Sequence, residues 1–157
     1  MSSGIELACV NPWLYIKENP LTTYQWWRYE ASNFCGSPQW VSSPLGYFTG
    51  PDSIVIAVWA GYRVPGAYSL TLRYTRELKG QNTLDTPYAE GKDAVSLAAP
   101  SGIVETKNVV HVRGEVQPLP SLGLALDLFF VMTQNLDNVR AQDATDLQIV
   151  TSVRFRM

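Results

Sequence analysis

The residues that most often carry catalysis are sparse in this chain. The single histidine, His111, lies in the alternating segment VVHVRG, and the two cysteines, Cys9 and Cys35, belong to no Cys-x-x-Cys pair. A zinc site or a Ser-His-Asp arrangement would have to recruit that one histidine. The Gly-x-Ser-x-Gly elbow and the glycine-rich phosphate loops are missing from the sequence. We interpret His111 as a strand residue and the cysteines as free, partly buried thiols, with one disulfide as the alternative in an extracellular protein.

Paired carboxylates are the remaining catalytic possibility, because glycoside hydrolysis needs two of them across a cleft. Four acidic residues are candidates for such a pair: Glu77, Glu105, Glu115 and Asp127. Glu77 and Glu115 fit the solvated face of a strand. Asp127 interrupts the apolar segment LALDLFF, so its carboxylate needs water or a partner, and we expect either an exposed position or an ion pair with Arg154 or Arg156. The sequence predicts no enzyme, no cofactor and no metal.

The elements that would position these residues are strands. Residues 67–78 alternate strictly, with Tyr68, Leu70 and Leu72 on one parity and Ser69, Thr71 and Arg73 on the other. We expect the apolar side chains to be buried along one side of the core, and the polar side chains to be exposed to solvent or to contact a partner. Residues 53–60 are continuously apolar and predict a strand buried on both faces. The short link 61–66 makes the two strands antiparallel neighbours.

The C-terminal part predicts three more strands. Residues 108–117 and 122–133 form a long hairpin around the proline-containing stretch PLPS, and the alternation in 147–157 makes a terminal strand. Two longer polar connections, 79–93 and 134–146, are predicted to be contact loops.

The N-terminal third is rich in aromatic residues between prolines and glycines. We expect short strands at 13–16, 22–31 and 44–48, with a helix as the alternative for 22–31. Trp26 and Trp27 on one strand would point to opposite faces, so something must cover each side. Aromatic residues of this kind fill the core between two sheets, or they act with arginine as interface anchors. The candidate interface or ligand contacts are Trp13, Trp26, Trp27, Arg28, Tyr29, Trp40 and Tyr47.

Composition bounds the class of protein. The chain has 157 residues, of which 46% are hydrophobic and 17% charged, and its net charge of -2 is spread without long runs. A dedicated nucleic-acid binder is disfavoured because it needs clustered cations. The longest apolar stretch, 122–132, is too short for a membrane-spanning helix, and the N-terminus has no signal-peptide pattern. Seven to nine expected strands predict a single all-β domain over residues 1–157, a two-sheet antiparallel β-sandwich with the jelly roll as the favoured arrangement.

The segments SIVIAVWAGYRVPGAYSLTLRYTRELKG and LGLALDLFFVM, together with an end just after a strand, resemble the jelly-roll coat proteins of small icosahedral RNA viruses, of picorna-like or satellite type. The resemblance implies a virion capsid or projecting-domain subunit that assembles with copies of itself or with other structural subunits. This chain differs from many such coats in lacking the Arg-rich N-terminal arm with which they hold RNA. A lectin-like, carbohydrate-binding module is the second hypothesis, in which Trp13, Trp40 and Tyr47 would stack on a glycan.

Overall fold

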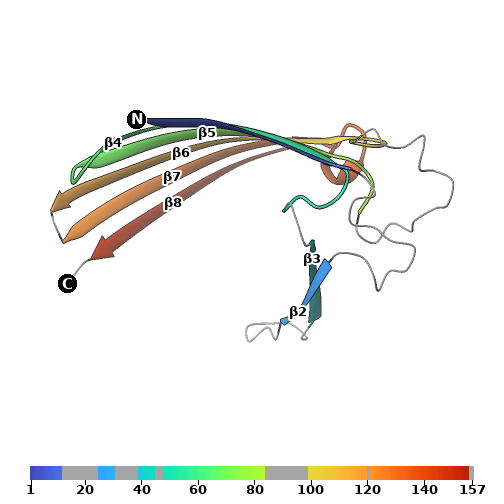
Figure 1. Ribbon diagram of the computed structural model, residues 1–157, viewed down its shortest axis with the longest axis horizontal. Helices are drawn as coiled ribbons and strands as arrows, with labels where there is room; N and C mark the ends of the chain where they lie inside the picture. The colour runs from blue at the N-terminus through green and yellow to red at the C-terminus, as the bar shows by residue number, and fades with distance from the viewer. Residues whose placement is uncertain (12–24, 31–38, 45–47, 84–98, 120, 156–157) are drawn as a thin grey trace. The chain divides into compact units, whose positions relative to one another are not determined.

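A computed structural model describes residues 1–11, 25–30, 39–44, 48–83, 99–119 and 121–155 of the chain (Figure 1). The chain divides into two compact units. The first comprises Met1–Leu7, Val55–Leu78 and Glu105–Met157, and the second comprises Ala8–Ile54 and Lys79–Val104.

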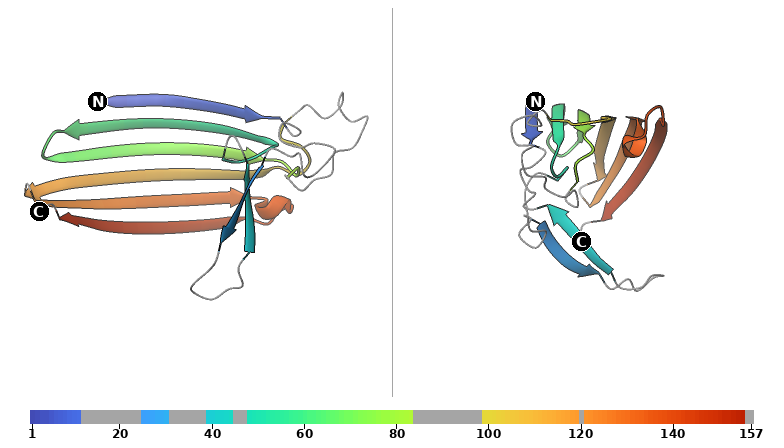
Figure 2. Two further views of the ribbon diagram at one scale, coloured as in Figure 1. Left: turned by 60° about the horizontal axis from the view of Figure 1, so that its bottom comes forward. Right: turned by 90° about the vertical axis from the view of Figure 1, so that its right-hand side faces the viewer.

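Six antiparallel strands form one open sheet in the order β1-β4-β5-β6-β7-β8, as Figure 2 shows. Their bounds are β1 Ser2–Val10, β4 Ser53–Val64, β5 Tyr68–Lys79, β6 Glu105–Leu119, β7 Leu122–Gln134 and β8 Ala144–Phe155. A separate pair consists of β2 Gln25–Glu30 and β3 Gln39–Pro44, and a 3-10 turn, η2, covers Leu136–Asn138. The prediction of an all-β antiparallel protein is therefore confirmed. The two-sheet sandwich is not, because the long strands lie in a single layer.

The expected strands correspond to β4, β5, β6, β7 and β8, and the segment 22–31 contains the strand β2 rather than a helix. The strands β1 and β3 were not expected from the sequence. The expected strand at 13–16 lies outside the described residues, as do most of 44–48 and residues 84–98 of the predicted loop.

The β6–β7 hairpin sets the positions of the polar residues. Its register pairs Arg113 with Asp127 and His111 with Phe129, and it shifts between Val116 and Leu119. Pro118 lies within that shift, where its missing N–H costs no ladder hydrogen bond. The strand β8 continues the ladder on the other side of β7.

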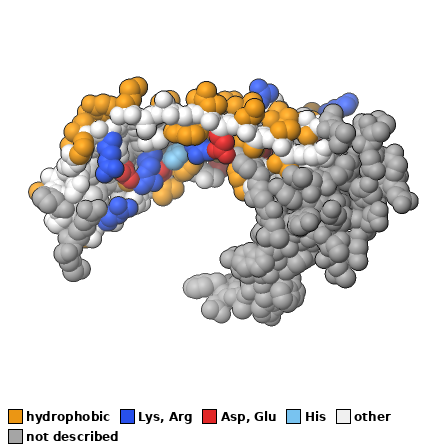
Figure 3. Space-filling view, viewed as in Figure 1, with side chains coloured by type: hydrophobic (Ala, Val, Ile, Leu, Met, Phe, Trp, Pro, Cys, Tyr) orange, Lys and Arg blue, Asp and Glu red, His pale blue; other side chains and the backbone are white. Residues whose placement is uncertain are grey.

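The register gives the sheet two different faces. On one face, which we call the apolar face, Leu124, Leu126 and Phe130 of β7 lie beside Val153, Thr151 and Leu147 of β8. The opposite face, the polar face, carries His111, Arg113, Glu115 and Asp127. Side-chain contacts extend both faces to β5, because Tyr74 binds Asn108 on the apolar face and Ser69 binds Glu115 on the polar face. Figure 3 shows hydrophobic side chains along most of the upper side of the sheet, with a few basic ones toward its right-hand end, and a cluster of charged side chains beneath it.

The apolar face is exposed, which corrects two expectations. In β4 only one parity is buried, with Val55 and Ala57 covered, whereas Ile56 and Val58 are 38% and 42% exposed. In β5 the apolar parity of Leu70 and Leu72 is half exposed and is not a wall of a core. A strand buried on both faces needs a layer on each side. Within the described chain, no such layer covers the apolar face of these strands.

The second unit is held by a buried carboxylate, that of Asp52. It accepts hydrogen bonds from the backbone N–H groups of Ser101 at 2.8 Å and Asn82 at 3.0 Å, and from the Ser101 hydroxyl at 2.5 Å. The ammonium of Lys79 donates to the carbonyls of Thr49 and Pro51. Asp52 thus joins the segments that precede β4 and follow β5, because a fully buried carboxylate is stable only when its oxygens are bonded.

Candidate functional site

The predicted contact residues fall into two groups. Trp26, Trp27, Arg28 and Tyr29 lie on β2 and Trp40 lies on β3, whereas Trp13 and Tyr47 are outside the described residues. The β2–β3 register pairs Tyr29 with Trp40, so it brings these two together, and it pairs Trp27 with Ser42. Their role in contacts stays a prediction.

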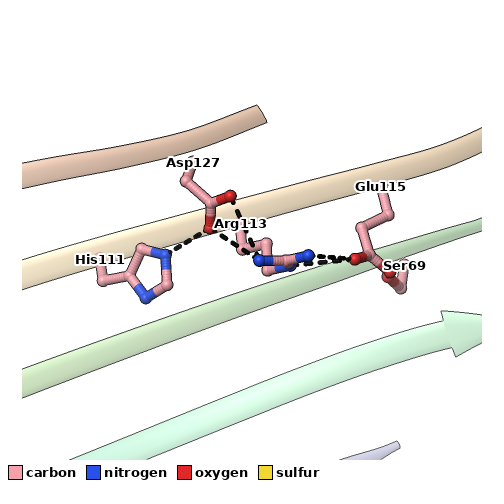
Figure 4. A network of polar contacts seen from close by, with 5 residues as sticks. All are labelled: Ser69, His111, Arg113, Glu115 and Asp127. Carbon is pink, nitrogen blue, oxygen red and sulfur yellow. Dashed lines mark hydrogen bonds and ion pairs between the residues drawn. The ribbon is translucent and has the colours of Figure 1, made fainter. Parts of the chain in front are cut away.

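A chain of polar contacts crosses β5, β6 and β7 on the polar face (Figure 4). At its centre, Asp127 binds Nε2 of His111 at 2.8 Å and accepts hydrogen bonds from Nη1 of Arg113 at 3.2 and 3.3 Å. Arg113 also donates to Oε1 of Glu115, from Nε at 3.0 Å and from Nη2 at 2.5 Å. The hydroxyl of Ser69 donates to Oε2 of Glu115 at 3.2 Å. We call these five residues the polar network.

Local strand geometry explains why the network forms. His111, Arg113 and Glu115 are two residues apart on β6, so the pleat directs all three to one face. The hairpin register then places Asp127 directly opposite Arg113. The His111 ring stacks on its register partner Phe129, with ring centroids 4.1 Å apart and planes 6° apart. Packing and hydrogen bonding together fix the imidazole.

Burial and charge divide the network into two parts. Asp127 is 7% exposed, while the side chains of Arg113 and Glu115 are 39% and 43% exposed. The hydrogen bond from Arg113, with that from Ser69 and the charges of Arg113 and Arg154, lowers the pKa of Glu115 despite opposition from burial. The reciprocal hydrogen bond to Glu115, with the charges of Asp127 and Glu115, raises the pKa of Arg113. At neutral pH the Arg113–Glu115 pair is ionised and screened by water.

The network is suited to holding strands together. Asp127 orients His111, but the hydroxyl of Ser69 is bonded to Glu115. A hydrolytic triad would need a nucleophile hydrogen-bonded to the imidazole, and the contacts of the described residues include none. The described residues also contain no group of three or more His, Cys, Asp or Glu side chains placed to hold a metal ion. The contacts of the network join β5 to β6 and β6 to β7, so they hold these three strands together.

The structure confirms part of what the sequence predicted for the carboxylates and corrects the rest. Asp127 forms the expected ion pair, but with Arg113 rather than Arg154, because Arg154 is the register partner of Gly123. Glu115 is a member of the network and not merely a solvated residue. Glu105 accepts a hydrogen bond at 2.7 Å from the backbone N–H of Asp137 and so fixes the loop before β8.

A small pocket adjoins the network near the turns that join β4 to β5 and β6 to β7. Its volume is about 140 Å³, and Arg63, Ser69, Glu115, Ser152 and Arg154 contribute its polar lining. Two arginines and one glutamate give it a mixed charge, and Glu115 is already bonded to Arg113 and Ser69.

The apolar face is the larger candidate site. Eighteen large hydrophobic side chains, between 38% and 76% exposed, lie on its parity across all six strands: Ile5, Leu7, Ile56, Val58, Tyr62, Tyr68, Leu70, Leu72, Tyr74, Val116, Leu124, Leu126, Phe130, Met132, Leu147, Ile149, Val153 and Phe155. With roughly half of each side chain exposed, they present on the order of 1,500 Å² of apolar surface. The largest such patch on a typical monomer is about 300–600 Å². The exposed apolar area of this face is therefore larger than the largest patch of a typical monomer.

No family model, curated protein or solved structure matches this chain. Among the described residues, no helix is both long enough and apolar enough to cross a bilayer. Cys9 on β1 is a free thiol, but it is exposed rather than partly buried as expected, and Cys35 lies outside the described residues. The function must therefore be argued from the sheet itself.

Proposed function

We propose that this protein is a non-enzymatic structural subunit whose apolar face packs against the same face of a second copy. The observation that carries the proposal is the continuous exposed apolar surface of the six-stranded sheet. Leaving it in water is unfavourable by about 25 cal/mol for each Å² of apolar area. A protein built for a monomeric existence would cover or charge that face.

The area supports a second copy as the occupant. A stable protein interface buries about 800 Å² on each partner, and the apolar face offers more than that. The face is also nearly uncharged, since Arg76 is the one charged residue on the apolar parity of β5 and the middle of β7 carries leucine and phenylalanine there. A surface without a charge pattern fits a copy of itself, because no like charges oppose one another across it.

The proposed contact also produces the second layer that the sequence predicted. Two antiparallel sheets pack face to face about 10 Å apart, with their strands within about 30° of each other. In this arrangement each chain supplies one sheet, and the β-sandwich is complete only in the dimer. Contacts between the aromatic residues of β2 and β3 and further subunits stay a prediction.

A shell-forming role, as a viral coat or projecting-domain subunit in the virion, is the specific form of the proposal. It draws on the resemblance to coat proteins and on the absence of a nucleophile bonded to His111 among the described contacts. No cofactor enters this function. Binding of a glycan by the N-terminal aromatic residues is the competing hypothesis, and polysaccharide titration with tryptophan fluorescence distinguishes the two.

The test is the mass in solution of matched variants. Leu72→Glu places a charge on the apolar face in β5, and Thr71→Glu places the same charge on the polar face one residue away. Wild-type protein and Thr71→Glu are expected to sediment as dimers or larger species of the 17.5 kDa chain, and Leu72→Glu at a lower mass than either. Circular dichroism checks that both variants fold.

Two results contradict the proposal. A wild-type protein that stays monomeric at its highest soluble concentration overturns the second copy as the occupant of the face. If Leu72→Glu and Thr71→Glu lose assembly equally, the added charge causes the loss on either face, and the apolar face is not the contact surface.

A further inference from the structure

The strand β8 has an open edge that is unusually well suited to pairing. It is the last strand in the sheet order, it spans twelve residues from Ala144 to Phe155, and every one of them is exposed. It contains no proline, glycine or lysine, although natural sheets commonly use proline, lysine or bulges to block an edge. Five of its residues are the β-branched types that favour strands: Thr145, Ile149, Val150, Thr151 and Val153.

The sequence of β8 is self-complementary about Val150. If a second β8 runs antiparallel with its own Val150 opposite, Asp146 of each copy faces Arg154 of the other. The same register sets Leu147 against Val153 and Gln148 against Ser152. Every directly opposed pair shares a face, because residues equally far from Val150 have the same parity.

Other registers lose this match. A shift of one residue opposes the apolar and polar parities, for example Leu147 against Ser152. A shift of two residues in the pairing keeps the parity but moves Asp146 off Arg154. Among the residues of β8 itself, the Val150 register is therefore the one that gives two opposite-charge pairs, and it buries a valine that is 50% exposed on the polar face. A pairing centred on Thr151 instead sets Asp146 opposite Arg156, which follows the end of β8 in the sequence.

The edge at β1 offers no such match. Its one charged residue within the strand is Glu6, which forms an ion pair with Arg73 at 3.5 Å. Pairing two β1 strands about Glu6 would oppose two carboxylates, and like charges directly opposite each other destabilise a sheet.

We infer that β8 pairs edge to edge with β8 of a second copy, antiparallel and centred on Val150, so that two six-stranded sheets become one continuous sheet of twelve strands. The pairing is isologous and two-fold, with the ion pair between Asp146 and Arg154 made twice. It deepens the proposed function, since an apolar face and a self-pairing edge give each subunit two different contacts. A subunit with two such contacts can build an assembly larger than a dimer.

The first experiment reverses the charges. Asp146→Arg opposes two arginines at each end of the pairing, so its edge dimer is expected to weaken by about tenfold or more in a sedimentation series. The double variant Asp146→Arg with Arg154→Asp restores opposite charges and is expected to recover the wild-type mass. Recovery in the double variant supports the inference, and a mass unchanged by the single variant overturns it.

The second experiment reads the register directly and does not depend on affinity. In a background with Cys9→Ser and Cys35→Ser, Val150→Cys places two thiols opposite each other, where Cβ atoms are about 4.5–5.5 Å apart in paired strands. Mild oxidation with copper phenanthroline is expected to give a disulfide-linked dimer. Gln148→Cys and Ser152→Cys are expected to cross-link only when mixed, which a size tag on one of them reveals. A Val150→Cys protein that stays monomeric on denaturing gels, or Gln148→Cys that cross-links alone, overturns the register.

These outcomes separate the edge from the apolar face. Loss of mass in Leu72→Glu with no Val150→Cys disulfide leaves the proposed function intact and removes the β8 pairing. If Val150→Cys forms a disulfide but Leu72→Glu does not change the mass, the β8 pairing is supported and the proposed contact through the apolar face is removed.

Discussion

Removal of the Asp127 carboxylate is the most direct perturbation of the polar network. Asp127→Ala leaves Arg113 and His111 without their shared acceptor, although both donors keep some access to water, with 39% and 23% of their side chains exposed. A hydrogen bond to a charged group contributes about 1.5–3 kcal/mol, and solvent screening reduces the share of the more exposed arginine. We therefore expect Asp127→Ala to lower the free energy of unfolding by about 2–3 kcal/mol. Asp127→Asn keeps one acceptor oxygen and should cost about half as much.

Urea unfolding followed by circular dichroism measures this change, at one fixed protein concentration because association shifts apparent stability. A loss of this size lowers the melting temperature by roughly 5–10 °C in a chain of this length. The matched control is Glu6→Gln, which removes an exposed carboxylate that pairs with Arg73 at 3.5 Å on the same face. It should change stability by less than about 0.5 kcal/mol. If Asp127→Ala and Glu6→Gln cost the same, the network does not tie the strands together.

Three further predictions follow from local contacts. Because Arg113 holds the pKa of Glu115 below its ordinary value of 4.5 in the folded chain, ionised Glu115 stabilises folding above that value and the stabilisation is lost as the pH falls through the folded pKa. The stability difference between wild type and Glu115→Gln should therefore shrink on acidification below about pH 4.5, and a difference independent of pH would contradict the assignment. Asp52→Ala should lower the free energy of unfolding by about 3 kcal/mol or more, because it leaves the N–H groups that Asp52 accepts from without a partner and places alanine at a φ of 58°. Asp52→Asn should lower it by less. Hydrogen exchange at the amides of Ser101 and Asn82 measures the loss of these hydrogen bonds, and unchanged protection there would contradict the prediction. Gly114→Ala should raise stability by about 0.5–1 kcal/mol, since its added methyl group meets no atom within 4 Å, and a lower melting temperature would show that the space is needed.

The polar network could be predicted only in part from the sequence. The sequence singles out His111, Glu115 and Asp127 as individual residues, without relating them to one another, although strand alternation places residues 111, 113 and 115 on one face. Arg113 was overlooked, although it occupies the same parity between them. The β6–β7 hairpin register, in which Leu119 pairs with Leu122, makes Arg113 and Asp127 partners. The Arg113–Asp127 pair could therefore be predicted from the sequence once the hairpin register was known. The expected pair with Arg154 was wrong, because the β7–β8 register depends on a longer loop.

The sequence by itself determined the strands of the C-terminal two thirds and their amphipathic faces. Alternation along residues 67–78 and 147–157 is a local property of the backbone, so it predicted β5 and β8 without any tertiary information. Alternation says which residues share a face, but it does not say which face is covered. Leu70 and Leu72 were expected inside a core and are half exposed. Only the strand order β1-β4-β5-β6-β7-β8 decided this, because burial depends on which layers a chain can stack, and the long strands here form one layer with an open edge at each side.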